Sequence, residues 1–413
     1  MPVKNLSSVR NQYALQEKFL GQRLKQLLPV LMREQGIGLW LVLCREYNED
    51  PVFSTLVPPL AKNASRLCCF AFVCDDARFS AISLCRPNPR FAPYYEQGYN
   101  PNEEDQWEAI AKIMAKYGST GVYVNISDDC PMADGLSALL KEKLVQHLPA
   151  GTRLKSAEQL VVRWLETRTE AELALYPEIH RLPVGILRDA YSRKVITPGV
   201  TTTTDVEYYI MQRIAEIGMT AWFAPDVDLQ RRGESDQRMC GVVIEEGDLL
   251  HTDWGLVCCG LHTDTQRLGY VLRQSEGESE IPPGILAGFL RGNRFQDIVR
   301  NNFIAGRTGN KIFEKSIAAA EAENLRPMLY SHPIGVHGHA AGPCIGLYDN
   351  PGFVPGRGEY KLHDSSCFAL ELNVTEYVPE WKQDACFFLE ETIAFVGGET
   401  YFMDDARDKI QLI

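Results

Sequence analysis

The pattern of apolar and polar residues predicts amphipathic helices along the whole chain. Residues 14–35 carry apolar side chains at helical spacing, and Gly36 follows them as a helix stop signal. The same spacing predicts helices over 106–117, 285–304 and 310–323. Both halves of the chain therefore contain helices.

Two capping motifs mark further helices in the middle of the chain. Thr169 and Glu172 have the spacing of a capping box, and so do Thr204 and Glu207. Pro177 falls inside the first of these helices, where we expect it to kink or interrupt the helix because proline lacks a backbone N–H. The second helix carries one apolar stripe, as a helix packed against a core does.

Short apolar runs predict β-strands between these helices. Early in the chain such runs alternate with helical segments, which is typical of a compact α/β domain ending near residue 160. Farther on, strands dominate. The predicted fold class is α/β (α+β), with two domains at 1–160 and 161–413. The predicted strands are 37–44, 66–73, 79–85, 120–125, 242–257, 264–272, 367–374 and 386–396.

The composition is that of a globular protein with ample core. Of the 413 residues, 45% are hydrophobic and 23% are charged. The 42 Lys and Arg residues against 54 Asp and Glu residues give a net charge of -12, which argues against nucleic acid or an anionic membrane as a partner. No run approaches the roughly 18 consecutive apolar residues of a membrane span.

The cysteines indicate a reducing compartment. Twelve of them are scattered through the chain, including the adjacent pairs Cys68-Cys69 and Cys258-Cys259, and several lie in apolar runs. We interpret them as buried free thiols. No Cys-x-x-Cys spacing occurs, which argues against a thiolate zinc site. The first five residues carry no apolar signal region, so the predicted location is the cytoplasm.

Two aspartates suggest where the chemistry lies. Asp253 and Asp264 stand eleven positions apart, in strand-like segments joined by a turn that contains glycine. Antiparallel strands connected in this way can point both side chains into one cavity. Two carboxylates so close repel each other unless a positive charge lies between them. A metal centre is the natural candidate for that charge.

Three further residues can complete a metal centre. His332 begins a loop rich in glycine and histidine, and Glu371 and Glu390 lie inside apolar strand-like runs. Ionised carboxylates are costly to bury unless they are paired or bind a metal. Four carboxylates and one imidazole suit a pair of divalent ions such as Mn²⁺, Co²⁺, Fe²⁺ or Zn²⁺, and such pairs activate a water molecule as a nucleophile.

Each residue alone also has an ordinary structural interpretation. Asp253 could belong to a turn, since an Asp-x-Gly near a strand end is a common turn signal. Glu371 and Glu390 could point to solvent from alternate strand positions. The histidines of the 332–339 segment could be polar loop residues. The metal centre is favoured only by the order and spacing of the whole set.

That order resembles the ligand order of the pita-bread metallopeptidases, which include methionine aminopeptidase, aminopeptidase P, prolidase and the creatinase-like proteins. Asp253-Trp-Gly255 and Thr263-Asp264-Thr-Gln-Arg267 resemble the family's Asp-x-Gly and Ser/Thr-Asp-x-x-Arg signatures. Ser331-His-Pro-Ile-Gly335, with His339, resembles its His-x-x-Gly loop. Leu389-Glu-Glu-Thr392 resembles its last ligand strand.

The resemblance extends beyond the site. Residues 168–175 and 198–205 resemble the opening of the family's catalytic domain, and residues 14–44 resemble the start of a creatinase-type amino-terminal domain. It implies a carboxy-terminal pita-bread fold, in which helices cover a curved antiparallel sheet, after an amino-terminal α/β domain. The implied function is that of a dinuclear-metal hydrolase cleaving a short peptide or amide, similar to Xaa-Pro aminopeptidase or dipeptidase. A homodimer is implied as well.

Carried over position by position, the resemblance implies roles for six residues. The metal ligands would be Asp253, Asp264, His332, Glu371 and Glu390. Of these, Asp264 and Glu390 would bridge two divalent ions, Mn²⁺ in first place and Co²⁺, Zn²⁺ or Fe²⁺ otherwise. Glu371 would also carry a proton from the attacking water to the leaving amine. His339 would hydrogen-bond the substrate carbonyl or the tetrahedral oxyanion.

Two positions depart from the family's pattern. A substrate-facing histidine usually stands seventeen or eighteen residues before the first ligand, where this chain has Ser235 and Asp236. Proline-specific members often carry an arginine two residues before the last ligand, where this chain has Phe388. Asp236 would either contact a cationic amine of the substrate or be a solvated loop acid.

Two other functions are open on the sequence. A relative of this family could use the same metal chemistry on a small non-peptide molecule. A binding protein could reuse the fold without catalysis, although such proteins generally lose ligands that this chain keeps. The expected partners are a short peptide or small amide and a second copy of the chain, with no nucleic acid and no membrane.

Overall fold

The computed structural model of the protein describes residues 6–403 and 407–413. The chain divides into two compact units, one of residues 10–169 and one that joins the chain up to Val9 with residues 170–413. None of the described helices combines the length and the apolar character that crossing a bilayer requires.

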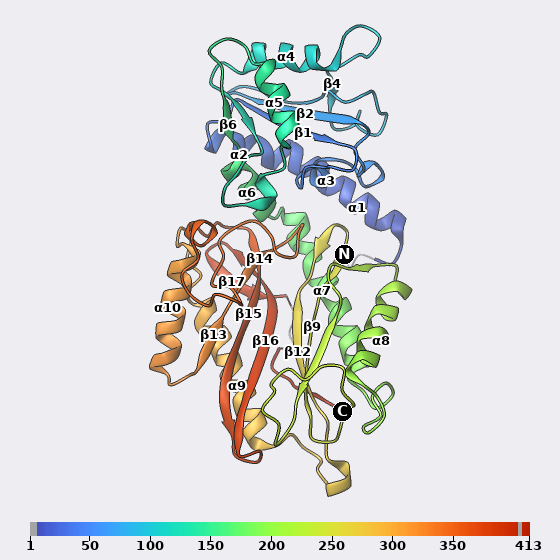
Figure 1. The fold of residues 1–413 in the computed structure, drawn as a ribbon, viewed down its shortest axis with the longest axis vertical. Helices are drawn as coiled ribbons and strands as arrows, with labels where there is room; N and C mark the ends of the chain where they lie inside the picture. Colours follow the sequence, from blue (N-terminus) through green and yellow to red (C-terminus); the bar gives the residue numbers. More distant parts are fainter. Residues whose placement is uncertain (1–5, 404–406) are drawn as a thin grey trace. The chain divides into compact units, whose positions relative to one another are not determined.

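The amino-terminal unit is built on a six-stranded mixed sheet (Figure 1). Its strands are β1 (Leu39–Arg45), β2 (Leu67–Cys74), β3 (Phe79–Ser83), β4 (Glu96–Gln97), β5 (Val122–Val124) and β6 (Leu154–Ser156). They lie in the order β4-β3-β2-β1-β5-β6. The central strands β1 and β2 are buried almost throughout, as their unbroken apolar sequences require.

Helices pack around this sheet. They are α1 (Val9–Gln22), a π-helical turn at Arg23–Leu27, α2 (Leu28–Glu34), α3 (Phe53–Leu56), α4 (Gln106–Tyr117), α5 (Ala138–Gln146) and α6 (Glu158–Glu166). The helix predicted over 14–35 is thus confirmed, with an earlier start and a π-helical turn in its middle. It ends before Gly36, whose φ of 63° favours glycine.

The second unit carries a nine-stranded sheet that is antiparallel except for one short pairing. Its strands are β8 (Asp226–Gln230), β9 (Leu249–Trp254), β12 (Thr265–Tyr270), β13 (Pro327–Leu329), β14 (His332–Ile334), β15 (Ser366–Val378), β16 (Gln383–Val396), β17 (Glu399–Phe402) and β18 (Gln411–Leu412). The main order is β13-β15-β16-β12-β9-β8. A smaller sheet combines β7 (Thr220–Ala221), β10 (Leu256–Cys258) and β11 (Leu261–His262). The predicted α/β class, with a mixed sheet before an antiparallel one, is confirmed.

Helices cover one face of the large sheet. They are α7 (Glu170–Ala190), α8 (Thr203–Glu216), α9 (Pro283–Arg300) and α10 (Gly309–Ala322). At Gly288 of α9, an added Cβ would lie 2.2 Å from the ring of Phe387 on β16, so glycine lets this helix approach the sheet closely. Since side chains alternate along a strand, Phe388 and Glu390 project from the opposite face. That face is left for the candidate site.

Three local predictions were wrong. The strand predicted from residue 242 begins only at Leu249, because Gly247, with φ of 90°, makes a turn just before it. Helix α7 continues through Pro177, so the interruption expected there does not occur. The capping box of α8 uses Thr202 and Asp205, since Thr202 is the last extended residue before the helix.

Candidate metal centre

Four side chains lie in one row across four neighbouring strands. Asp253 on β9 pairs with Gln266 on β12. Gln266 pairs in turn with Glu390 on β16, and Glu390 pairs with Glu371 on β15. Residues directly opposite each other in antiparallel strands project from the same face of the sheet. The row therefore places three carboxylates and one amide on the face opposite α9.

Asp264 and His332 both lie in the next row of the sheet, on the same side of this one. Asp264 lies two positions before Gln266, so the strand periodicity brings it to the same face. His332 begins β14 and pairs with Ala369, two positions before Glu371. The Nε2 atom of His332 lies 3.6 Å from Oδ2 of Asp264 and 3.8 Å from Oε2 of Glu371.

The potential ligand atoms form two overlapping groups. Asp264, His332 and Glu390 offer one atom each, all within 4.8 Å of one another, and so do Asp253, Glu371 and Glu390. Glu390 is common to both groups, as a carboxylate between two ions would be. The four acids and the one imidazole that the sequence predicted as ligands thus lie close together.

The chemistry of these atoms fits bound cations. Several lack a hydrogen-bond partner among the described residues: Oδ1 of Asp253, Oδ1 of Asp264, both carboxylate oxygens of Glu390, and Nε2 of His332. Asp264 is 4% exposed and Glu390 is 1% exposed, so the solvent-facing interpretation of Glu390 is wrong. Burying carboxylates without a partner is strongly unfavourable, whereas oxygen ligands with one imidazole suit divalent first-row ions.

Burial raises the pKa of every acid in the centre, and repulsion by neighbouring acids adds to this for Asp253, Glu371 and Glu390. Burial first, and then the charge of Asp264, raises the pKa of Asp253 to about 8. Burial likewise raises the pKa of Asp264 to about 8. Burial, followed by the neighbouring acids, raises the pKa values of Glu371 and Glu390 well above the usual range. Without a compensating cation, these groups retain protons.

His332 is prepared to act as a neutral ligand. Burial lowers its pKa to about 4, so the ring carries no charge at neutral pH. Its Nδ1 lies 3.0 Å from the backbone oxygen of Pro333, to which it can donate its one proton. The lone pair of Nε2 then faces the acids, as in metal sites where the second ring nitrogen is fixed by a carbonyl.

The sequence did not single out Gln266 and His251, which support the acids. The Gln266 amide nitrogen donates to Oε1 of Glu371 at 2.6 Å and lies 3.4 Å from Oδ2 of Asp253. Its oxygen lies 2.9 Å from Nε2 of His251, and Nδ1 of that ring lies 3.1 Å from Oδ2 of Asp228. His251 is two positions before Asp253, so strand periodicity was the signal that could have found it.

His339 lies beside the centre. Its ring centroid is 4.6 Å from that of His332 and 5.2 Å from that of Trp222, both in edge-to-face geometry. Desolvation by the surrounding protein, followed by the charges of His332 and Arg357, lowers the pKa of His339 below its usual range. Its side chain is exposed, so a neutral imidazole can donate a hydrogen bond to a molecule bound over the centre.

Ser235 and Asp236 occupy an exposed loop. Oδ1 of Asp236 accepts a hydrogen bond from the backbone nitrogen of Arg238 at 2.9 Å. This geometry is that of a short polar turn, in which the Asp side chain caps the backbone two residues on. The solvated-loop interpretation of Asp236 therefore describes its position.

Arg238 reaches from this loop toward the metal ligands. Its Nε lies 2.7 Å from Oδ2 of Asp228, and Nη2 lies 2.6 Å from Oδ2 of Asp226. The guanidinium also lies over the ring of Phe388, 5.7 Å from its centroid. Phe388 also packs against His251, with ring centroids 4.9 Å apart. A cation thus approaches the position of Phe388 from another segment of the chain.

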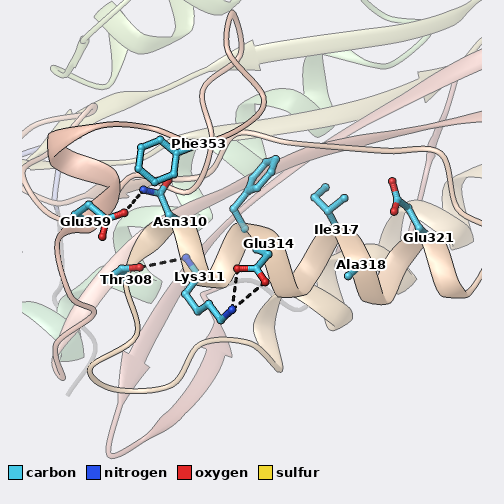
Figure 2. A pocket seen from close by; sticks show the side chains of 10 residues that line it. Thr308, Asn310, Lys311, Glu314, Ile317, Ala318, Glu321, Phe353 and Glu359 are labelled. Atoms are coloured by element: carbon cyan, nitrogen blue, oxygen red, sulfur yellow. Dashed lines mark hydrogen bonds and ion pairs between the residues drawn. The ribbon is translucent and has the colours of Figure 1, made fainter.

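A separate hollow of about 620 Å³ lies along α10 (Figure 2). Several of its charged and polar groups pair with one another: Nζ of Lys311 lies 2.8 Å from a carboxylate oxygen of Glu314, and the amide of Asn310 bonds the carboxylate of Glu359. None of the candidate ligands lines it. The hollow therefore lacks the convergent chemistry of the metal centre.

No protein-family model matches this sequence, and no curated protein matches it. The fold, however, has close counterparts among solved structures. The X-Pro aminopeptidase from Thermotoga maritima MSB8 is 13% identical, with 93% of this chain and 100% of that chain covered and a TM-score of 0.66. The Xaa-Pro dipeptidase from Bacillus anthracis is 15% identical, with coverages of 96% and 100% and a TM-score of 0.62. The chain thus has the two-domain pita-bread fold of Xaa-Pro peptidases, as its sequence predicted.

The same fold also occurs outside the peptidases. The N-terminal domain of the FACT complex subunit SPT16 from Cicer arietinum is 12% identical, with 97% of this chain and 96% of that chain covered and a TM-score of 0.55. The fold alone therefore does not decide between hydrolysis and binding, and the side chains of the site have to do so.

Proposed function

We propose that this protein is a dinuclear-metal hydrolase that cleaves a short peptide or small amide, in the manner of an Xaa-Pro aminopeptidase or dipeptidase. The observation that carries this proposal is the cluster of Asp253, Asp264, His332, Glu371 and Glu390, whose potential ligand atoms converge and several of whose buried atoms lack a hydrogen-bond partner among the described residues. A fold that had become a binding scaffold would have no physical reason to keep so costly a cluster.

These five residues would hold two divalent ions, with Mn²⁺ in first place and Co²⁺, Zn²⁺ or Fe²⁺ as alternatives. Asp264 and Glu390 would bridge the pair. Such ions supply an activated water nucleophile and stabilise negative charge at the substrate carbonyl.

Glu371 is the proposed proton carrier. It would take a proton from the attacking water and deliver it to the leaving amine. Burial raises the pKa of Glu371, which makes its carboxylate a better proton acceptor than that of an ordinary glutamate. His339 would donate a hydrogen bond to the substrate carbonyl oxygen, where charge develops in the transition state.

The surroundings of the centre bear on the substrate. Phe388 stands where proline-specific relatives often carry an arginine, and the guanidinium of Arg238 lies over its ring. Arg238 is already paired with Asp226 and Asp228, so its charge is largely compensated. The proposed substrate is therefore a short peptide or amide. A panel of substrates would determine which residues are accepted around the scissile bond.

We further propose that the protein acts in the cytoplasm as a homodimer. Eleven of its twelve cysteines are buried and all are free thiols, which suits a reducing compartment. The proposed dimer rests on the resemblance to two-domain peptidases alone. Its direct test is the molar mass in solution, measured by light scattering.

Metal-free protein loaded with Mn²⁺, Co²⁺ or Zn²⁺ tests the activity. We expect about two ions per chain and hydrolysis of one or more Xaa-Pro dipeptides or tripeptides. A protein that binds no divalent ion after metal-replete purification would overturn the proposal. Stoichiometric metal without turnover of any peptide or amide would instead favour a binding role, for which the likeness to a FACT complex subunit is the supporting observation.

A further inference from the structure

Gln266 occupies the centre of the row of acids without belonging to the ligand groups. It lies between Asp253 and Glu390 in the sheet register and is 1% exposed. Its amide nitrogen donates to Oε1 of Glu371 at 2.6 Å and approaches Oδ2 of Asp253 at 3.4 Å. A single buried amide thus contacts two acids that belong to the same ligand group.

The environment fixes which way this amide points. Once a bound ion holds Glu371 and Asp253 in the ionised form, they can only accept hydrogen bonds, so the NH₂ group has to face them. The amide oxygen then faces Nε2 of His251 at 2.9 Å and accepts a hydrogen bond from it. The reverse orientation would set an oxygen against the acids and an NH₂ group against the N–H of the ring.

His251 is fixed in its turn. Its Nδ1 lies 3.1 Å from Oδ2 of Asp228, and that carboxylate is held by Nε of Arg238 at 2.7 Å. Asp228 and His251 are both buried, and they pair directly in the register of β8 and β9. A continuous chain of hydrogen bonds therefore runs from Arg238 to the acids of the centre.

The two carboxylate oxygens of Glu371 have different contacts. Oε1 is engaged by the amide, while Oε2 faces Nε2 of His332 at 3.8 Å. A carboxylate held by one oxygen has lost its freedom to rotate, and its second oxygen stays directed at the neighbouring ligands.

We propose that Gln266 is a positioning residue, which holds Glu371 and Asp253 in the orientation for metal binding and is itself oriented by His251 and Asp228. This inference rests on the proposed function and adds to it a residue of this chain that would orient two of the proposed ligands. Gln266 does not touch substrate or the reacting atoms. It acts through the two acids that its amide contacts.

Gln230 provides a matched control in the same sheet. It is 2% exposed, and its amide group bonds the backbone oxygen of Cys386 at 2.6 Å and the backbone nitrogen of the same residue at 2.8 Å. Like Gln266, it is a buried glutamine whose amide bonds a residue on another strand of the sheet. Unlike Gln266, it contacts none of the metal ligands. Replacing each by methionine removes a buried amide of the same size.

The test is titration of metal-free protein with Co²⁺, followed by calorimetry and by the visible absorption of the bound ion. For Gln266→Met we expect about 10- to 100-fold weaker uptake of Co²⁺ in at least one of two sites, and altered absorption bands, because residues that hydrogen-bond metal ligands have effects of this size. For Gln230→Met we expect a lower Tm and a titration like that of the wild type.

Gln266→Asn is a second variant that keeps the test decisive if Gln266→Met does not fold. It keeps a buried amide but is one methylene shorter, so it cannot keep both the 2.6 Å bond to Glu371 and the bond to His251. We expect it to fold and to bind Co²⁺ more weakly than the wild type does.

The outcomes separate the two proposals. Wild-type affinity and absorption in Gln266→Asn and in any folded Gln266→Met would overturn the positioning role and leave the proposed function standing. An equal loss of affinity in Gln230→Met would also overturn it, because the effect would then come from general damage to the sheet. A wild-type protein that takes up no Co²⁺ would overturn the proposed function together with this inference.

Discussion

Glu371 and Glu390 lie directly opposite each other on β15 and β16, with both side chains on the same face of the sheet. Like charges at directly opposed positions destabilise a pair of strands. The adjacent pair, Leu372 and Leu389, is buried on the other face of the sheet, where apolar packing holds the two strands together. The sheet thus holds the two acids close together despite their repulsion. Bound cations would relieve that repulsion.

Asp264→Asn and Glu390→Gln should lower metal binding from about two ions per chain to one or none, with loss of hydrolysis. Each change removes a negative charge and one ligand oxygen from the overlapping groups while keeping the size of the side chain. Metal content after dialysis, measured by mass spectrometry, and hydrolysis of the best Xaa-Pro substrate are the two measurements.

Glu391→Gln is the matched control for these variants. Glu391 follows Glu390 but projects from the other face, where Arg267 binds both of its oxygens at 2.6 and 2.9 Å. Breaking a buried pair of this kind should lower the stability by roughly 3 kcal/mol and leave the metal content at the wild-type value. A metal loss in Glu391→Gln equal to that in Glu390→Gln would contradict the assigned ligand set.

His339→Ala should lower kcat by about 10²-fold with metal content and KM near their wild-type values, because a hydrogen bond to a developing oxyanion acts mainly in the transition state. The ring is next to His332 but lies outside both ligand groups. Steady-state kinetics with Mn²⁺-loaded protein is the measurement, and His147→Ala in the amino-terminal unit is the control. A loss of metal rather than of kcat would make His339 a ligand.

Gly288→Ala should destabilise the second unit by about 1–3 kcal/mol, because the new methyl group would overlap the Phe387 ring and force α9 away from β16. Gly185→Ala in α7 is the control. An added Cβ there meets no heavy atom within 4 Å, and alanine should stabilise the helix by about 0.5–1 kcal/mol. Chemical denaturation of both variants decides it: equal stability changes would mean that α9 does not pack closely on the sheet.

The set of candidate ligands could be predicted because the order and spacing of its five residues can be read directly from the sequence. An acid such as Glu371 or Glu390 inside an apolar run is rare enough to need a partner, whatever the register of the strands. The strands themselves were visible for the same reason, since β15 and β16 contain the predicted runs 367–374 and 386–396.

The supporting residues gave no such signal. Gln266 and Glu371 are 105 positions apart, and only the register of β12, β16 and β15 brings them together. The family's usual spacing before Asp253 pointed to Asp236 as a possible substrate contact. In the structure, Arg238 is the residue that reaches inward. The direction of a loop side chain depends on turn geometry, which residue spacing does not encode.

Without metal, the protein should lose stability as the pH rises from 7 to 9. The folded pKa values of Asp253 and Asp264 are about 8, raised from about 3.8, so the stability tied to their protonation is complete below about pH 3.8 and is lost as the pH rises through 8. Asp50, with a pKa of about 6, and His332, with a pKa of about 4, have finished titrating by pH 7. A difference of one bound proton between the folded and unfolded states changes the stability by about 1.4 kcal/mol per pH unit, or the Tm by roughly 3–5 °C.

Mn²⁺ should reverse this trend, because the acids have to lose their protons before they bind the ion, so its stabilising effect grows with pH. Thermal unfolding of metal-free and Mn²⁺-loaded protein at several values between pH 7 and 9 measures both slopes. In Asp264→Asn the metal-free slope should be shallower, since one titrating group is gone and Asp253 loses its repelling neighbour. A metal-free Tm that is flat or rising across this window would contradict the clustering of acids from which the metal centre is inferred.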